Sequence, residues 1–168
     1  MAAGRQHRPG HPAVGALLVA RANILLAVSG SPFDMQLVQI ACSLAQRAKG
    51  KLYVVHVLEV PRALPLDANM AEESKRADSI LTHVEDAASK LKCQLESEII
   101  QARDVAQTLV DEAEDRQVGL LIMGMQRREK YGKFYLGSTI PAVLASAKCR
   151  VWIIREGLDE AVLPPLPV

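Results

Sequence analysis

The sequence predicts a doubly wound α/β fold, in which helices cover both faces of a five-stranded parallel sheet. Continuous apolar runs alternate along the chain with amphipathic segments whose apolar residues recur every three or four positions. Runs that are apolar throughout are typical of parallel strands covered on both faces. The 168 residues, of which 49% are hydrophobic, are enough chain for one domain with its own core.

The first strand is predicted at residues 23–28 (NILLAV) and is followed by a helix. We expect Ser31 to cap this helix, Asp34 to complete a capping-box-like pair with it, and Gly50 to end it. One face of the helix is apolar and carries Leu37, Ile40, Ala41, Leu44, Ala45 and Ala48.

The second and third strands are predicted at residues 52–58 (LYVVHVL) and 95–100. His56 interrupts the apolar run of the second strand, and we expect it to be buried and hydrogen-bonded and not to act as a catalytic base. The third strand alternates apolar residues with Glu96 and Glu98, which is typical of an edge strand. The helix between the two strands has an apolar side formed by Ala77, Ile80, Leu81, Val84, Ala88 and Leu91.

The fourth and fifth strands are predicted at residues 118–123 (VGLLIM) and 151–154 (VWII). A helix with the capping pattern of Asp104 and Gln107 precedes the fourth strand, and a basic loop and a short helix follow it. This alternation implies right-handed crossovers and a parallel sheet. The ligand of such a sheet lies beyond the carboxyl ends of the strands, where the strand order reverses.

We assign residues 23–156 to the domain and the two ends of the chain to tails. Residues 1–22 combine Gly, Pro and Arg with a short apolar run, so we expect a disordered extension, with a signal peptide as the alternative. Residues 157–168 are proline-rich and are expected to form an extended tail. No run approaches the roughly 18 apolar residues that span a bilayer, so we expect no direct membrane insertion.

Net charge and cysteine spacing argue against two kinds of site. The 20 basic and 19 acidic residues give a net charge of +1, which argues against a protein that binds nucleic acid through bulk charge. Cys42, Cys93 and Cys149 lie far apart in the sequence and lack the spacing of a zinc site. We expect buried free thiols in a reducing compartment, and therefore a cytoplasmic protein.

The loop after the fourth strand carries the clearest signal for a ligand. Gly124 leaves the strand where a side chain would crowd a ligand. Residues 127–133 hold four basic residues and one acidic residue, which is a local charge of +3. Residues 137–139 (GST) open a helix, whose free N–H groups and dipole suit a phosphate. The alternative is a solvated basic loop with an ordinary Ser/Thr cap.

No established phosphate-binding or catalytic motif fits the chain. Gly132 and Gly137 have the spacing of a Walker A loop, but Ser138 stands where its lysine should be. No GxGxxG follows the first strand, and no Ser/His/Asp or Cys/His arrangement is recognisable. We therefore expect little or no catalysis.

Several segments resemble the universal stress protein family. The pattern Gly124-x2-Arg127-x9-Gly137-Ser138 is similar to the family motif Gly-x2-Gly-x9-Gly-(Ser/Thr), with Arg127 in place of the second glycine. The first strand and its exit, ILLAVSGS, resemble the family's ILVAVDGS, with Ser29 in place of the aspartate. The segments VVHVLEVP, LLIMG and AKCRVWIIRE are similar to the later strands of the family.

The resemblance, which covers residues 23–156, implies the strand order 3-2-1-4-5 and a site for an adenine nucleotide. In ATP-binding members, the exit of the first strand and the segment after the second strand hold adenosine, and the loop after the fourth strand holds the phosphates. The implied ligand is ATP or another adenine nucleotide, with Mg²⁺ as its companion. The implied site residues are Val28, Ser29, Gly30, Ser31, Val57, Met123, Gly124, Gln126, Arg127, Gly137, Ser138 and Thr139.

The resemblance also implies a homodimer through the fifth strand, which forms one edge of a sheet with this order. An apolar edge without a central proline or lysine is a template for pairing with a second copy of the chain. The residues of this edge are Val151, Trp152, Ile153 and Ile154.

Three functions remain open from the sequence. The first is a stress-associated regulatory protein that binds ATP and has little or no catalytic activity. The second is a universal-stress-type interaction module that binds no nucleotide and acts beside a partner such as a transporter, and Ser29 and Arg127 favour it. The third is a slow ATP-hydrolysing or phosphotransfer enzyme, although no candidate base is visible.

Overall fold

The computed structural model describes residues 23–125, 129–130, 133–134 and 136–156, and the expectations for the two tails lie outside these residues. The main sheet has five parallel strands in the order β3-β2-β1-β4-β7, which confirms the predicted topology. Its strands are β1 (Asn23–Ala27), β2 (Leu52–Glu59), β3 (Leu95–Ala102), β4 (Val118–Met125) and β7 (Arg150–Arg155).

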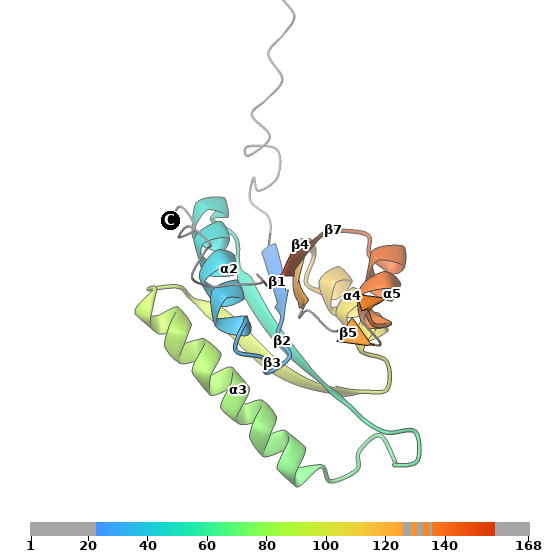
Figure 1. Cartoon of the computed structure of the whole chain (residues 1–168). Coiled ribbons are helices and arrows are strands. Elements are labelled where there is room, and N and C mark those ends of the chain that lie inside the picture. Colours follow the sequence, from blue (N-terminus) through green and yellow to red (C-terminus); the bar gives the residue numbers. More distant parts are fainter. Residues whose placement is uncertain (1–22, 126–128, 131–132, 135, 157–168) are drawn as a thin grey trace, which may run out of the picture.

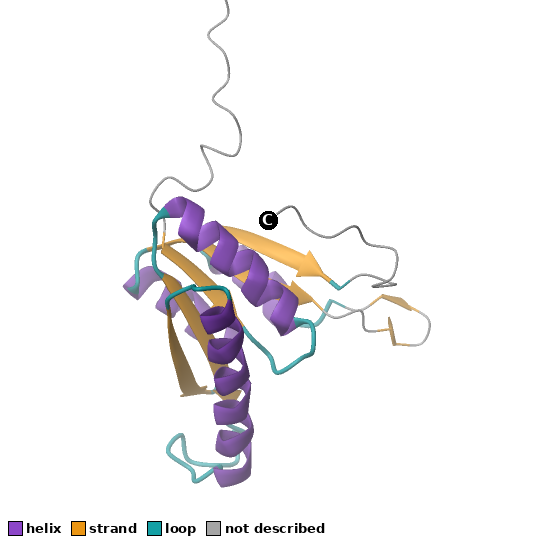
Figure 2. Cartoon of the chain, turned by 90° about the vertical axis from the view of Figure 1, so that its left-hand side faces the viewer, coloured by secondary structure: helices purple, strands orange, loops and turns teal. Residues whose placement is uncertain are grey.

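The helices form a layer on each face of this sheet. Helices α2 and α3 pack on one face, and α4 and α5 pack on the other (Figure 1). Figure 2 shows α2 and α3 in front of the sheet. Among the described residues, no helix combines the length and the apolar character needed to cross a membrane. The helices are α2 (Asp34–Ala48), α3 (Ala71–Lys90), α4 (Val105–Asp115) and α5 (Thr139–Ser146).

The central strand β1 is covered on both sides, which explains its unbroken apolar run. Ile24 and Leu26 join the core beside α2 and α3, whereas Leu25 joins the core beside α4 and α5. All three side chains are fully buried. In β3, by contrast, Glu96 and Glu98 are exposed, as predicted for an edge strand.

The two ends of α2 differ from the predictions. The helix begins at Asp34, and Ser31 does not cap it, because the Asp34 carboxylate accepts hydrogen bonds from the preceding turn instead. At the other end, the left-handed residue is Lys49, with φ of 52°, and not Gly50. Gly50 follows it and donates its N–H to the carbonyl of Ala45 at 3.2 Å.

Three further details concern the later elements. Asp104 caps α4 as predicted and accepts a hydrogen bond of 3.0 Å from the N–H of Gln107. Leu91, which we expected on the apolar side of α3, lies just after the helix and is exposed. The loop after β4 contains a short antiparallel pair that the sequence did not predict, β5 (Glu129–Lys130) with β6 (Lys133–Phe134).

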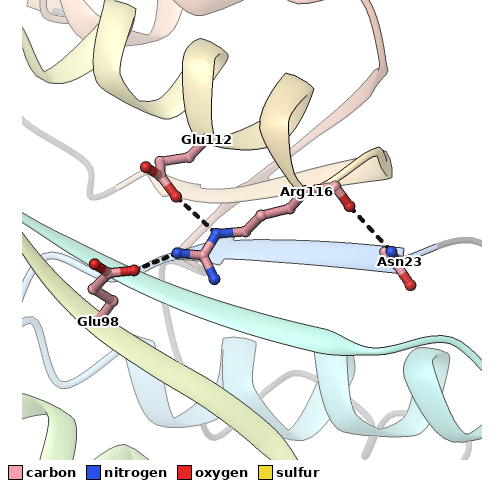
Figure 3. A network of polar contacts seen from close by, with 4 residues as sticks. All are labelled: Asn23, Glu98, Glu112 and Arg116. Carbon is pink, nitrogen blue, oxygen red and sulfur yellow. Dashed lines mark hydrogen bonds and ion pairs between the residues drawn. The ribbon is translucent and has the colours of Figure 1, made fainter.

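Arg116, the residue after α4, ties this helix to three strands, and Figure 3 shows its contacts with Glu112, Glu98 and Asn23. Its Nε donates to Glu112 at 2.7 Å, and its Nη2 donates to Glu98 of β3. Its guanidinium lies 4.8 Å from the ring centroid of Tyr53 in β2. Its backbone carbonyl accepts a hydrogen bond of 3.1 Å from the side-chain amide of Asn23 in β1. The contacts hold the end of α4 over the first three strands, at the amino ends of β1 and β2 and the middle of β3.

Candidate functional site

The exit of β1 lies between β2 and β4, at the point where the strand order reverses. Ala27, the last residue of β1, is aligned with Val55 of β2 and with Met123 of β4. Just beyond it, Val28 donates its N–H to the carbonyl of Val55 at 3.0 Å. The carbonyl of Val28 lies 3.0 Å from Nδ1 of His56. These contacts hold the exit of β1, where the sequence predicted part of the site, against the middle of β2.

His56 and Val57 lie on the β2 side of this junction. His56 is half-buried, and its Nδ1 carries a hydrogen, because a carbonyl oxygen can only accept. The expected hydrogen bond is therefore present, although the side chain is less buried than we predicted. Val57 is half-buried and packs on the side of the sheet that α4 and α5 cover.

The turn after β1 is held by a buried carboxylate. Asp34 is 2% exposed, and its Oδ2 accepts hydrogen bonds from the N–H groups of Ser29 at 3.0 Å, Gly30 at 2.7 Å and Ser31 at 3.0 Å. The hydroxyl of Ser31 donates to Oδ1 at 3.2 Å. Three consecutive N–H groups that point at one anion form a concave anion site, and here the chain fills it with its own carboxylate.

This arrangement decides which part of a ligand the turn can contact. The N–H groups of Ser29, Gly30 and Ser31 are already used, and a phosphate placed there would meet the negative charge of Asp34. The exposed side chain of Ser29 can still donate or accept a hydrogen bond. The turn therefore suits a neutral sugar or base better than it suits a phosphate.

Gly30 is required by the same turn. Its φ is +85°, a conformation that side chains other than glycine rarely adopt. A Cβ at this position would also lie 2.6 Å from Cδ1 of Ile80 in α3. Glycine thus permits both the turn and the close approach of α3 to the exit of β1.

Gly124 has a packing role that the sequence did not predict. A Cβ there would lie 2.5 Å from Cδ1 of Leu37 and 3.4 Å from Cδ1 of Phe33, so the missing side chain makes room for α2. We expected the space to be needed by a ligand. The neighbouring Met123 is buried in the core beside α4 and α5. A contact of either residue with a ligand stays a prediction.

The start of α5 forms the other part of the site. Gly137 has φ of +76°, and a Cβ built on it would meet no atom of the described residues within 4 Å. Among these residues it therefore faces open space, unlike Gly30 and Gly124. Ser138 is the N-cap residue, is exposed, and makes no side-chain capping bond. Thr139 is the first helical residue and is half-buried.

Two of the predicted site residues, Gln126 and Arg127, lie outside the described residues. In the described part of the chain, no group of three or more His, Cys, Asp or Glu side chains could hold a metal ion. Two cavities, of about 530 and 150 Å³, lie at the amino ends of the strands, away from the predicted site. The larger lies beside the first residues of β2 and β3, and the smaller beside the first residue of β4. Neither cavity is lined by any of the predicted site residues that the structure describes.

Asp34 is the residue that sequence reasoning misassigned. Its spacing from Ser31 matches a capping pair, and the two residues are indeed bonded, but the carboxylate acts on the turn and not on the helix. The signal that could have revealed this is a glycine-containing turn directly before the acid, because such a turn can aim several N–H groups at one carboxylate.

Comparison with known proteins places the chain among proteins with this fold. The model of the universal stress protein family matches residues 20–155. The chain is similar to universal stress protein A homolog 2 of Coxiella burnetii, with 27% identity over 143 residues that cover 79% of this chain and 93% of the relative.

The solved structures similar to this chain include complexes with adenine nucleotides. The universal stress protein from Archaeoglobus fulgidus in complex with dAMP has a TM-score of 0.64 and 18% identity, covering 80% of this chain and 98% of that one. A universal stress protein family protein from Arabidopsis thaliana with AMP bound has a TM-score of 0.60 and 15% identity, covering 83% and 94%. At these identities the two structures establish a shared fold.

Proposed function

Because the chain belongs to the universal stress protein family, we propose that it is a stress-associated regulatory protein that binds ATP or another adenine nucleotide at the ends of β1 and β4. The observation that carries this proposal is the junction at Ala27 and Met123, where the strand order reverses and the two strand exits lie side by side. Ligands of open parallel sheets bind at such a point. The dAMP and AMP complexes of the two similar structures support the ligand class.

The two sides of the junction divide the nucleotide between them. The turn of Ser29 and Gly30 takes the adenosine, because its N–H groups are occupied by a carboxylate and it offers only neutral groups. The start of α5 takes the phosphates, because Gly137 leaves open space there and a helix start favours an anion. Pro141 carries no N–H, so the backbone donors of this helix start come from the residues before it.

Arg127 and the basic residues around it supply the positive charge for the phosphates in this proposal. A guanidinium can hold two phosphate oxygens at once. Mg²⁺ is a companion of the phosphates and is held by them, since the described side chains offer no cluster for it. The protein acts by binding, in the cytoplasm, and not by catalysis.

The test is calorimetry with ATP and with AMP on the parent protein and on two variants of one residue. Gly137→Glu places a carboxylate where the phosphates would lie and is expected to abolish binding of ATP. Gly137→Ala introduces the same backbone strain without the charge, and its Cβ meets no described neighbour, so it is expected to retain most of the affinity. Circular dichroism checks that both variants are folded.

The second function is an interaction module that binds no nucleotide, and Ser29 and Arg127 favour it. Ser29 stands where the family has an aspartate, so the exit of β1 lacks a charged acceptor. A neutral hydrogen bond is about half as strong as a charged one. Absence of any heat of binding by the parent protein at millimolar ATP and AMP would reject the first proposal and support this one. Steady release of phosphate from ATP would instead indicate an enzyme.

A further inference from the structure

Two thiols meet in the core between α2 and α3. Cys42 lies in the middle of α2, and Cys93 lies in the turn between α3 and β3. Both side chains belong to the core cluster that these helices share with the sheet, and the two thiols lie near enough for Cys93 to raise the pKa of Cys42. The sequence separates them widely, so only the tertiary structure brings them together.

Neighbouring hydrogen bonds hold the two backbones in this position. Gln46, one helical turn after Cys42, donates its side-chain amide to the carbonyls of Leu91 at 3.1 Å and Lys92 at 3.3 Å. Cys93 donates its N–H to the carbonyl of Ala88 at 2.9 Å. The turn is thus fastened to the face of α2 that carries Cys42. A disulfide needs its two Cβ atoms about 3.5–4.5 Å apart, a separation that two thiols of one core cluster can reach.

Only one of the two thiols has a path to solvent. Cys93 is 8% exposed and lines the cavity of about 530 Å³ between α3 and the beginnings of β2 and β3. Cys42 is 1% exposed and does not line this cavity. Burial and the contact with Cys93 raise the pKa of the Cys42 thiol, which keeps it protonated. A small neutral oxidant therefore reaches the sulfur of Cys93 first.

We propose that Cys42 and Cys93 are a redox-sensitive dithiol, which a hydroperoxide converts into an intramolecular disulfide. In the first step, the Cys93 sulfur attacks one peroxide oxygen and the O–O bond breaks, which gives a sulfenic acid and an alcohol or water. In the second step, the Cys42 sulfur displaces the hydroxyl group, which leaves as water with the thiol proton of Cys42. The two thiols lose two electrons in total, and the peroxide gains them.

The disulfide would link α2 to the turn that precedes β3, across a segment that contains β2 and α3. A cross-link of this kind restricts the unfolded chain and so stabilises the folded domain. Cys93 lies near the amino ends of β2 and β3, whereas the exits of β1 and β4 lie at the carboxyl ends of the strands. The proposal therefore does not depend on nucleotide binding.

The experiment treats the reduced, purified full chain with hydrogen peroxide and then labels free thiols with a maleimide under denaturing conditions. Of the three cysteines, only Cys149 is expected to take the label, and peptide mass mapping should show Cys42 joined to Cys93. The melting temperature should rise on oxidation and return after dithiothreitol. The matched control is Cys149→Ser, which should form the same disulfide.

The variant Cys42→Ala separates the two steps. Cys93 should still be oxidised, but as a sulfenic acid that dimedone traps, because no second thiol can displace its hydroxyl group. Three results would each overturn the proposal: full labelling of all cysteines after peroxide, oxidation of Cys93 beyond sulfenic acid in the parent protein without a disulfide, or a disulfide that involves Cys149.

Discussion

Oδ2 of Asp34 accepts a hydrogen bond of 2.7 Å from the backbone N–H of Gly30, and this contact defines the turn at the exit of β1. Gly30 reaches the carboxylate because its φ is +85°, and the N–H groups on either side point to the same oxygen. The shape of the turn is therefore set by groups of the chain itself. The buried carboxylate of Asp34 also places a negative charge beneath the turn.

Replacing Asp34 should destabilise the domain strongly. We expect Asp34→Ala to lower the free energy of unfolding by about 3 kcal/mol or more, because hydrogen bonds to a charged group contribute roughly 1.5–3 kcal/mol each. Asp34→Asn should cost less, since its amide oxygen still accepts. The control is Asp104→Ala, which removes an ordinary N-cap worth about 1 kcal/mol. Urea denaturation measures all three, and equal losses at positions 34 and 104 would contradict the role of the turn.

The cost of adding a side chain at Gly124 should depend on the side chain of Leu37. Gly124→Ala is expected to cost about 1–3 kcal/mol of unfolding free energy, because its Cβ would lie 2.5 Å from Cδ1 of Leu37. In a Leu37→Ala background the same change should cost clearly less, since the crowding atom is gone. Gly137→Ala, whose Cβ meets no atom of the described residues, should cost only about 1 kcal/mol through its backbone angle. An unchanged cost of Gly124→Ala in both backgrounds would show that α2 is not the reason for the glycine.

Arg116 should contribute more to stability than an exposed basic residue. Its side chain is 20% exposed, bonds two carboxylates and lies over Tyr53. We expect Arg116→Ala to cost about 1–3 kcal/mol, whereas Lys148→Ala, which breaks an exposed pair with Glu114, should cost less than about 1 kcal/mol. Thermal unfolding of the two variants tests this prediction. Similar losses of unfolding free energy would show that the contacts of Arg116 contribute no more than an exposed ion pair.

Arg127 is predicted from the sequence to contact phosphate. Arg127→Ala and Arg127→Gly should both weaken ATP binding by about 1–3 kcal/mol, the range for a hydrogen bond to a charged group. Calorimetry on both variants is the measurement, and AMP, with its single phosphate, is the comparison ligand. Tighter binding by the glycine variant would mean that Arg127 obstructs a site that the family's glycine leaves open.

The β7 edge can be tested at one backbone N–H. Glu156, just after β7, donates its N–H to Met125 of β4 at 2.9 Å, so the N–H of Ile154, two residues earlier, faces β4 and that of Ile153 faces the free edge. If a second copy pairs with this edge, Ile153→Pro should give a folded monomer in sedimentation velocity. The control Ile154→Pro should lose a bond within the sheet and lower the melting temperature instead. A folded dimer of Ile153→Pro would place the interface elsewhere.

The sheet and its helices were predictable because their signals are local. The run at residues 23–28 is apolar at every position, which requires cover on both faces, and the chain alternates such runs with one-sided helices. Parallel order and right-handed crossovers then follow from the chirality of the chain. The adjacency of the β1 and β4 exits was predictable for the same reason, together with the family resemblance. The pair β5 and β6 was missed because strands of two residues are too short to show a period.

The sequence by itself determined the order of elements, the apolar faces and the identity of the glycines at the predicted site. Only the tertiary structure decided what each of these residues touches. Gly124 accommodates α2, whereas Gly137 faces open space, and nothing in their local sequence distinguishes them. Cys42 and Cys93 meet because two helices pack on one face of the sheet. Such contacts join residues that are distant in the chain, and side-chain packing selects them after the local patterns have been satisfied.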